Sequence, residues 1–160
     1  MQANSFFKPL MIGLLIFVLG CSNEEVIETQ SPLPKYTFER GVFPPSPLGF
    51  VRIDETSYEM LKGGFEWRKG NMTSQTDSLS PTQAAEHFKA IEVKPNSEVY
   101  IEVEQKPKLS IYLWEEEKTK TIQLDENQMT LPEDEGRYIY EVRAAWENGE
   151  VSYIFVVEVQ

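Results

Sequence analysis

The 160-residue sequence contains one cysteine, Cys21, and one histidine, His87. A single cysteine cannot close an internal disulfide. A single histidine cannot build a multi-histidine metal site, and no serine–histidine–acid triad can be argued from it, so we interpret His87 as structural or solvated. The sequence also lacks a glycine-rich phosphate loop, an H-E-x-x-H motif and a nucleophile elbow. We therefore predict no catalytic residue, no metal site and no cofactor.

Positive charge is scarce. Lys and Arg number 15 against 26 Asp and Glu, which gives a formal net charge of -11. Binding to nucleic acid, or docking of a basic patch on anionic lipid, requires clustered Lys or Arg, and both are disfavoured here. We interpret the acidic runs at residues 115–117 and 133–135 as solvated loops, with attraction of Ca²⁺ or of a cationic partner as the alternative.

A hydrophobic run long enough to cross a bilayer is also missing. Residues 10–21 form an apolar stretch of about a dozen residues, whereas a spanning helix needs about 20, and the chain turns polar at once in residues 22–25. This length is typical of the apolar region of a signal peptide, and Lys8 precedes it.

The stretch ends in Val18-Leu19-Gly20-Cys21, which resembles the lipobox of bacterial lipoproteins. The resemblance implies a signal peptide over residues 1–20, lipid attachment at Cys21, and a protein anchored in the cell membrane on its extracytoplasmic face. An ordinary secretory signal or an uncleaved anchor is the alternative. Two or three acyl chains would hold such a protein firmly, whereas one anchors only marginally.

Residues 21–48 are interpreted as a flexible tether. The segment is polar at first and then carries five prolines, which lack a backbone N–H and favour extended conformations. The segment is interrupted by Tyr36, Phe38, Val42 and Phe43, which either dock on the following domain or mark a partner contact.

The remainder, residues 49–160, is predicted to be one all-β domain with one short helix. Short β-prone runs at 50–53 and 58–61 lead to a turn at 62–64, and 69–80 has the composition of a surface loop. Ser80-Pro81-Thr82-Gln83 matches a capping box followed by a helix over 81–88.

From residue 91 onward, apolar side chains recur with a period of two. The pattern predicts strands around 99–103, 109–113, 122–124, 129–131, 138–146 and 151–159, the last two joined by a type I′ turn at Asn148-Gly149. Crossover helices are lacking, so an antiparallel β-sandwich is favoured over a parallel α/β sheet.

The sequence Asp134-x-Gly136-x-Tyr138 resembles the tyrosine corner of immunoglobulin-like domains, in which the tyrosine hydroxyl bonds to upstream backbone. The resemblance implies an immunoglobulin-like sandwich in which Tyr140 replaces the usual disulfide cysteine. The whole layout also resembles small uncharacterised lipoproteins of Gram-positive, Bacillus-type bacteria. That likeness implies no activity.

The function expected is a non-enzymatic binding module, with an envelope protein or other extracytoplasmic ligand as partner. Loops at one end of the sandwich, or the aromatic residues Tyr112, Trp114 and Trp146, are the candidate contacts. The alternative is an inhibitor or regulator of an exported enzyme, because some Bacillus-type proteinase inhibitors are also small acidic sandwiches of this kind. An uncharacterised hydrolase is the third hypothesis.

Overall fold

The computed structural model describes residues 32–115 and 118–160. The predicted signal peptide (1–20), the lipid-attachment residue Cys21 and residues 22–31 of the predicted tether lie outside the described residues. Within the described residues the elements are, in chain order, β1 (Gly49–Ile53), β2 (Thr56–Glu59), β3 (Leu61–Lys69), β4 (Met72–Thr76), α1 (Pro81–Ala85), β5 (Ile91–Val93), β6 (Glu98–Val103), β7 (Lys108–Glu115), β8 (Lys118–Ile122), β9 (Gln128–Thr130), β10 (Gly136–Trp146) and β11 (Gly149–Val159).

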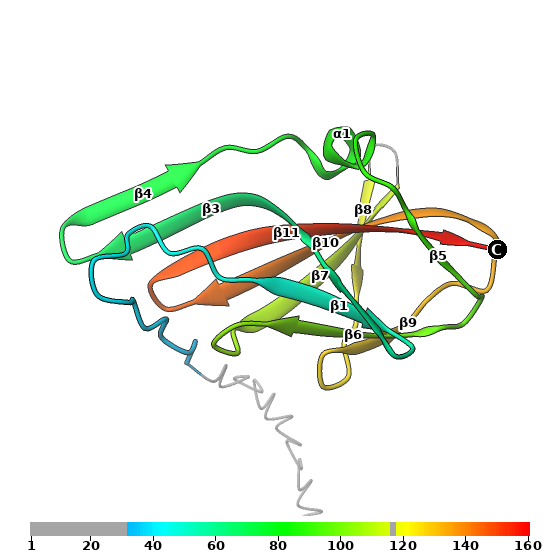
Figure 1. Cartoon of the computed structure of the whole chain (residues 1–160), viewed down its shortest axis with the longest axis horizontal. Helices are drawn as coiled ribbons and strands as arrows, with labels where there is room; N and C mark the ends of the chain where they lie inside the picture. Colours follow the sequence, from blue (N-terminus) through cyan, green and yellow to red (C-terminus); the bar gives the residue numbers. More distant parts are fainter. Residues whose placement is uncertain (1–31, 116–117) are drawn as a thin grey trace, which may run out of the picture. The chain divides into compact units, whose positions relative to one another are not determined.

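The strands form two sheets (Figure 1). The four-stranded sheet has the order β2-β1-β6-β9, and the seven-stranded sheet has the order β4-β3-β11-β10-β7-β8, with β5 added in parallel to β11. Buried side chains of both sheets form one apolar cluster, including Val51 and Ile101 from one sheet and Val142 and Val157 from the other. The prediction of an all-β, mainly antiparallel sandwich is confirmed at this level.

Strand β11 is paired along both of its edges. β10 pairs with its full length, from Gly149 to Val159. On the other edge, β3 pairs with the first half of β11 and β5 pairs with its last three residues. The inward-facing set predicted from the period of two is confirmed, since the following side chains are all buried: Val151, Tyr153, Phe155, Val157 and Val159.

The turn between β10 and β11 differs from the prediction. Trp146 pairs with Gly149, so Glu147 and Asn148 form the turn. Neither of them has a positive φ, which a type I′ turn requires, and that prediction is wrong. Gly149 is instead the first residue of β11, and a Cβ there would overlap Cε3 of Trp67. Glycine is needed here because the buried indole approaches the backbone.

Two other predictions near β3 are wrong, namely the turn at residues 62–64 and the surface loop at residues 69–80. β3 runs through Gly63 and Gly64 without turning, and residues 72–76 of the expected loop form β4. A Cβ on Gly63 would lie 3.2 Å from Oγ of Ser152, and one on Gly64 would lie 3.1 Å from the carbonyl oxygen of Thr76. Both glycines allow neighbouring strands to approach closely.

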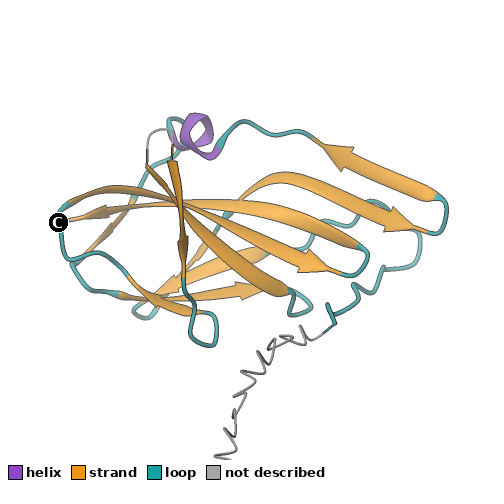
Figure 2. Cartoon of the chain, turned by 180° about the vertical axis from the view of Figure 1, so that it is seen from behind, coloured by secondary structure: helices purple, strands orange, loops and turns teal. Residues whose placement is uncertain are grey.

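Helix α1 begins where the sequence predicts and ends at Ala85, earlier than the expected residue 88. Ser80 Oγ accepts a hydrogen bond from the Gln83 N–H at 3.3 Å, and Gln83 Oε1 accepts one from the Ser80 N–H at 3.2 Å, which completes the capping box. The helix lies over β10 and β11 on the outer face of the larger sheet (Figure 2). Ile154 and Val156 point to this face and are 3% and 4% exposed. The helix therefore covers one part of the outer face.

Residues 32–48, predicted as part of a flexible tether, are packed on the domain. Tyr36 is 7% exposed, and Phe38 and Phe43 contact the core. The ring of Tyr36 lies 4.7 Å from that of Trp67 and 5.4 Å from that of Trp146, measured between centroids. Burial of these rings orders the segment, and its prolines do not prevent this packing. The folded domain thus includes residues 32–48.

The hydrogen bond expected of a tyrosine corner is present. The hydroxyl of Tyr138 donates to the carbonyl oxygen of Asp134 at 2.9 Å, and Gly136 between them has φ +152°, which other residues rarely adopt. Tyr140 points inward, is 1% exposed, and stacks on Phe155 with 4.9 Å between ring centroids. The local motif fixes the chain at the start of β10.

Replacing Gly149 with Ala should lower the free energy of unfolding by about 1–3 kcal/mol, because the new Cβ overlaps the buried Trp67 ring. Urea unfolding measures the change. Trp67→Phe removes the ring atoms closest to the new Cβ, while the Glu66 carbonyl oxygen stays 2.7 Å from it. The double variant should therefore lose less stability than the two single losses added together, although part of the loss remains. Additive losses would contradict this explanation of the glycine.

Tyr138→Phe should cost about 0.5–1.5 kcal/mol of unfolding free energy, because the Asp134 carbonyl loses its hydroxyl donor. Tyr140→Phe retains the ring stacked on Phe155 and should cost less. Thermal and urea unfolding of both variants test this order. A larger loss from Tyr140→Phe would show that the corner hydrogen bond contributes little.

Candidate functional site

The site is centred on Glu141 in β10, on the outer face of the seven-stranded sheet. Glu141 is 5% exposed and is the one buried charged residue within the described ranges. It alternates with the core residues Tyr140 and Val142, so its side chain points away from the core. A buried carboxylate is costly unless it is paired and hydrogen-bonded, which makes its partners informative.

Both oxygens of the Glu141 carboxylate accept hydrogen bonds from side chains. Oε1 accepts from Ser152 Oγ at 2.9 Å and from Arg143 Nε at 3.2 Å. Oε2 accepts from Trp114 Nε1 at 3.1 Å and from Arg143 Nη2 at 3.4 Å. Three strands contribute these donors, since Trp114 lies on β7, Arg143 on β10 and Ser152 on β11. The carboxylate thus fixes the positions of three side chains on neighbouring strands.

Arg143 connects this buried carboxylate to the surface. Its side chain is 56% exposed, and its Cζ atom lies 5.0 Å from the ring centroid of Tyr112 on β7. This is the geometry of a cation–π contact. Hydrogen bonding to Glu141 raises the pKa of Arg143 above its usual value, so the guanidinium keeps its positive charge. Tyr112, Trp114 and Arg143 together form a surface that we call the outer patch.

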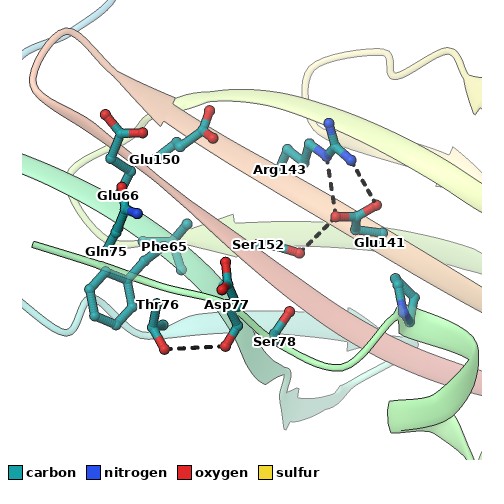
Figure 3. Close-up of a pocket in the computed structure, with 13 residues that line it drawn as sticks. Phe65, Glu66, Gln75, Thr76, Asp77, Ser78, Glu141, Arg143, Glu150 and Ser152 are labelled. Carbon is teal, nitrogen blue, oxygen red and sulfur yellow. Dashed lines mark hydrogen bonds and ion pairs between the residues drawn. The ribbon is translucent and has the colours of Figure 1, made fainter.

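A cleft of about 390 Å³ adjoins the outer patch. It is lined by residues of β3, β4, β10 and β11, by the segment between β4 and α1, and by the first residue of α1. Figure 3 shows Asp77 and Ser78 across the cleft from Ser152, with Glu66 and Glu150 at its other end. With Glu141 included, the lining holds four carboxylates and one cation, Arg143, so its charge is negative.

Two of the three aromatic residues predicted as partner contacts lie in the outer patch. Tyr112 and Trp114 are partly exposed and point outward, while Ile111 and Leu113 between and beside them are buried in the core. The prediction for Trp146 is wrong, because this residue is 3% exposed. It shares the inward parity of Tyr140 and Val142 and packs on Trp67, with 5.1 Å between ring centroids.

The sequence interpretation missed Glu141, Arg143 and Ser152. The period of two along the two long strands places these residues on the face opposite the core. In an acidic chain, however, a glutamate on an outer face is expected to be solvated. The useful signal is the pairing of Arg143 with Ser152 across β10 and β11, which depends on strand register. A carboxylate beside an arginine on one sheet face, next to a tryptophan on the neighbouring strand, would have identified the site.

The described residues offer few other chemical groups. In residues 32–115 and 118–160 no three His, Cys, Asp or Glu side chains converge as metal ligands. The same ranges contain no helix of the length and hydropathy needed to cross a membrane. The acidic run at 133–135 is exposed, whereas Glu116 and Glu117 of the other run lie outside the described residues.

Comparisons with protein-family models, with curated proteins and with solved structures found no match. The interpretation of the site therefore depends on its geometry. That geometry holds aromatic rings and a guanidinium in fixed positions at the surface, beside an acidic cleft.

Glu141→Gln should lower the free energy of unfolding by about 1–3 kcal/mol, because an amide offers one acceptor oxygen to donors that now share two. Glu150→Gln, an exposed neighbour in the same cleft, is the matched control and should leave stability unchanged. Urea unfolding at neutral pH compares them. Equal effects would show that the buried hydrogen bonds do not stabilise the fold.

Proposed function

We propose that this protein is a membrane-anchored extracytoplasmic lipoprotein whose sandwich domain is a non-enzymatic interaction module. Its partner is an envelope protein or other exported protein, bound through the outer patch of Tyr112, Trp114 and Arg143. The observation that carries the proposal is the buried carboxylate of Glu141, which holds Trp114 and Arg143 in place before any partner arrives.

The composition of the outer patch supports a protein partner. Trp, Tyr and Arg are the residues that most often dominate the energy of protein–protein interfaces. Ordering such side chains normally opposes binding by about 0.5–1.5 kcal/mol each. Here the indole of Trp114 and the guanidinium of Arg143 are already hydrogen-bonded, and the guanidinium stands over Tyr112. Most of that entropy has therefore been lost on folding.

The charge of the surroundings favours a basic partner. The cleft beside the outer patch carries Glu66, Asp77 and Glu150, and the whole chain has a formal net charge of -11. Opposite charges at the rim of an interface mainly raise the association rate and make it sensitive to salt. The partner surface should therefore present an acceptor for Arg143 at its centre and basic residues at its rim.

An immunoglobulin-like assignment is supported by how the strands are divided between the sheets. In such domains strands A, B and E share one sheet, and strands C, F and G share the other. Assigning β1, β6 and β9 to the first set and β7, β10 and β11 to the second reproduces this division. The Tyr138 hydrogen bond to Asp134 then stands at the entry to strand F.

A catalytic role for the Glu141 centre is disfavoured by its hydrogen bonds. Each carboxylate oxygen already accepts a bond from Arg143, and Ser152 donates to Oε1. Both oxygens of this carboxylate are thus already occupied by protein donors, and the sole histidine, His87, is an exposed residue after α1. The arrangement suits fixing a surface better than activating a nucleophile.

The anchoring part of the proposal rests on the lipobox and on the single cysteine. Few residues separate Cys21 from the first contact of the domain: residues 22–33 precede Pro34, whose carbonyl oxygen accepts a hydrogen bond from the Glu147 N–H. Twelve residues span at most about 40 Å when fully extended. The domain would therefore work close to the bilayer, against partners at the membrane surface.

Replacing Trp114 or Arg143 with Ala should weaken partner binding about tenfold or more, the usual loss at a central interface residue. The wild-type protein is first used to capture its partner from envelope extracts. The captured partner is then titrated against each variant to measure binding. Arg52→Ala is the matched control, because Arg52 stands 5.0 Å from the ring centroid of Tyr100 on the other sheet. Its binding should be unchanged.

A partner that binds both patch variants as tightly as the wild type would contradict the proposed surface. Glu141→Gln gives an independent check, since it retains all three patch side chains and loosens their support. It should weaken binding through faster dissociation. Loss of binding in Arg52→Ala, with the patch variants unaffected, would move the site to the four-stranded sheet.

Cys21→Ser should release the protein from membranes or leave it as an unprocessed precursor, because serine offers no thiol for lipid attachment. Membrane fractionation and the mass of the N-terminal peptide measure the outcome. Normal processing and retention of the Cys21→Ser chain would contradict the lipoprotein assignment.

A further inference from the structure

Residues 34–38, which we call the strap, cross one end of the sandwich without joining either sheet. The strap lies between two turns that are far from it in the sequence. One is the β6–β7 turn, which carries Gln105, and the other is the β10–β11 turn, which carries Asn148. We call the surface beneath the strap the end groove. Trp67 and Trp146 form its aromatic floor.

Two carboxamide side chains bind the backbone of the strap. Asn148 accepts a hydrogen bond from the Tyr36 N–H at 2.8 Å and donates one to the Tyr36 carbonyl at 3.0 Å. Gln105 accepts a hydrogen bond from the Thr37 N–H at 2.7 Å and donates one to the Thr37 carbonyl at 3.1 Å. Each amide reproduces the pair of bonds that a neighbouring strand would make. This is how proteins recognise an extended peptide through its main chain.

The side chain of Tyr36 is the anchor of the strap. Its ring is buried against Trp67 and Trp146, and Phe38 lies 5.9 Å from Trp67 between ring centroids. Burial raises the pKa of Tyr36 above its ordinary value, in keeping with a ring withdrawn from water. An aromatic anchor in a pocket, with main-chain bonds on both sides, is the arrangement of a bound peptide.

Part of the attachment of the strap is open to water. The bonds between Gln105 and Thr37 are exposed, so water can replace them at little cost. Trp67 Nε1 is buried and has no acceptor among the described residues, so the strap does not satisfy every polar group in the groove. Gly41, just after the strap, has φ +80°, and a Cβ built there would meet no atom within 4 Å, so neighbouring side chains do not obstruct rotation at this residue.

We propose that the end groove is a peptide-binding site whose occupant can be supplied by a second copy of this chain. The strap of each molecule swings about Gly41 and enters the groove of the other, as in domain swapping. The same strap sequence fits the groove in either molecule, because the contacts are those already made within one chain. The strap of the same molecule has a higher effective concentration at the groove than the strap of a second molecule. Exchange therefore requires a high concentration of the protein.

Complementation between two defective full chains in detergent micelles tests the proposal. One chain carries Tyr36→Ala, which removes the strap anchor and leaves the groove intact. The other carries Gln105→Ala and Asn148→Ala, which remove the groove amides and leave the strap intact. Each chain alone should sediment as a monomer, and the mixture should form a 1:1 complex that grows with concentration. A chain with all three substitutions is the control and should not join the complex.

A mixture that stays monomeric while both chains show cooperative unfolding would overturn the proposal. Amide hydrogen exchange in the wild-type chain is a second test, which does not require any variant to fold. The amides of Tyr36 and Thr37 should exchange through local opening, with protection at least about tenfold lower than that of β10 and β11. Exchange of these amides only on global unfolding would show that the strap is a fixed part of the fold and would also overturn it.

Discussion

The fold depends on strand β11 having a partner along both edges. β10 pairs with its whole length, while β3 and β5 divide its other edge between them. Its backbone groups are therefore largely paired within the sheet, which allows a strand of such apolar composition to be buried without orphaned N–H and C=O groups. The inward side chains of β11 fill the core, its outward Ile154 and Val156 are also buried, and α1 contacts the strand from this outer face. Removing β10 or β3 would expose backbone N–H and C=O groups of β11 and the apolar side chains on its two faces.

The same pairing determines where the two surfaces form. Register between β10 and β11 sets Arg143 beside Ser152, and register between β10 and β7 sets Glu141 beside Tyr112, which creates the outer patch. The β10–β11 turn carries Asn148 to the end groove, and Gly149 lets Trp67 approach the turn. One face of the hairpin thus supports the proposed partner surface, and its tip supports the strap.

Some local patterns predicted the local structure correctly. The capping box at Ser80, the Tyr138 hydrogen bond and the inward residues of β11 each depend on residues close together in the sequence or on strand period. Features that depend on contacts between distant segments were missed. Gly149 looks like a turn residue, but its role comes from Trp67, and the proline segment looks like a tether because its anchor, Tyr36, gains burial only from Trp67 and Trp146. Glu141 looks solvated in the sequence because its hydrogen-bond donors Trp114 and Ser152 lie on other strands.

The proposed interface depends on an outer patch that is rigid before any partner binds. The most direct measurement is ¹⁵N relaxation of the three indole N–H groups in the free protein, at Trp67, Trp114 and Trp146. Trp67 and Trp146 are buried and serve as rigid references. Although partly exposed, Trp114 should match them, with an order parameter of about 0.85, because its N–H is bound to Glu141. A value below about 0.6 for Trp114 would mean that the patch is mobile and would contradict the account.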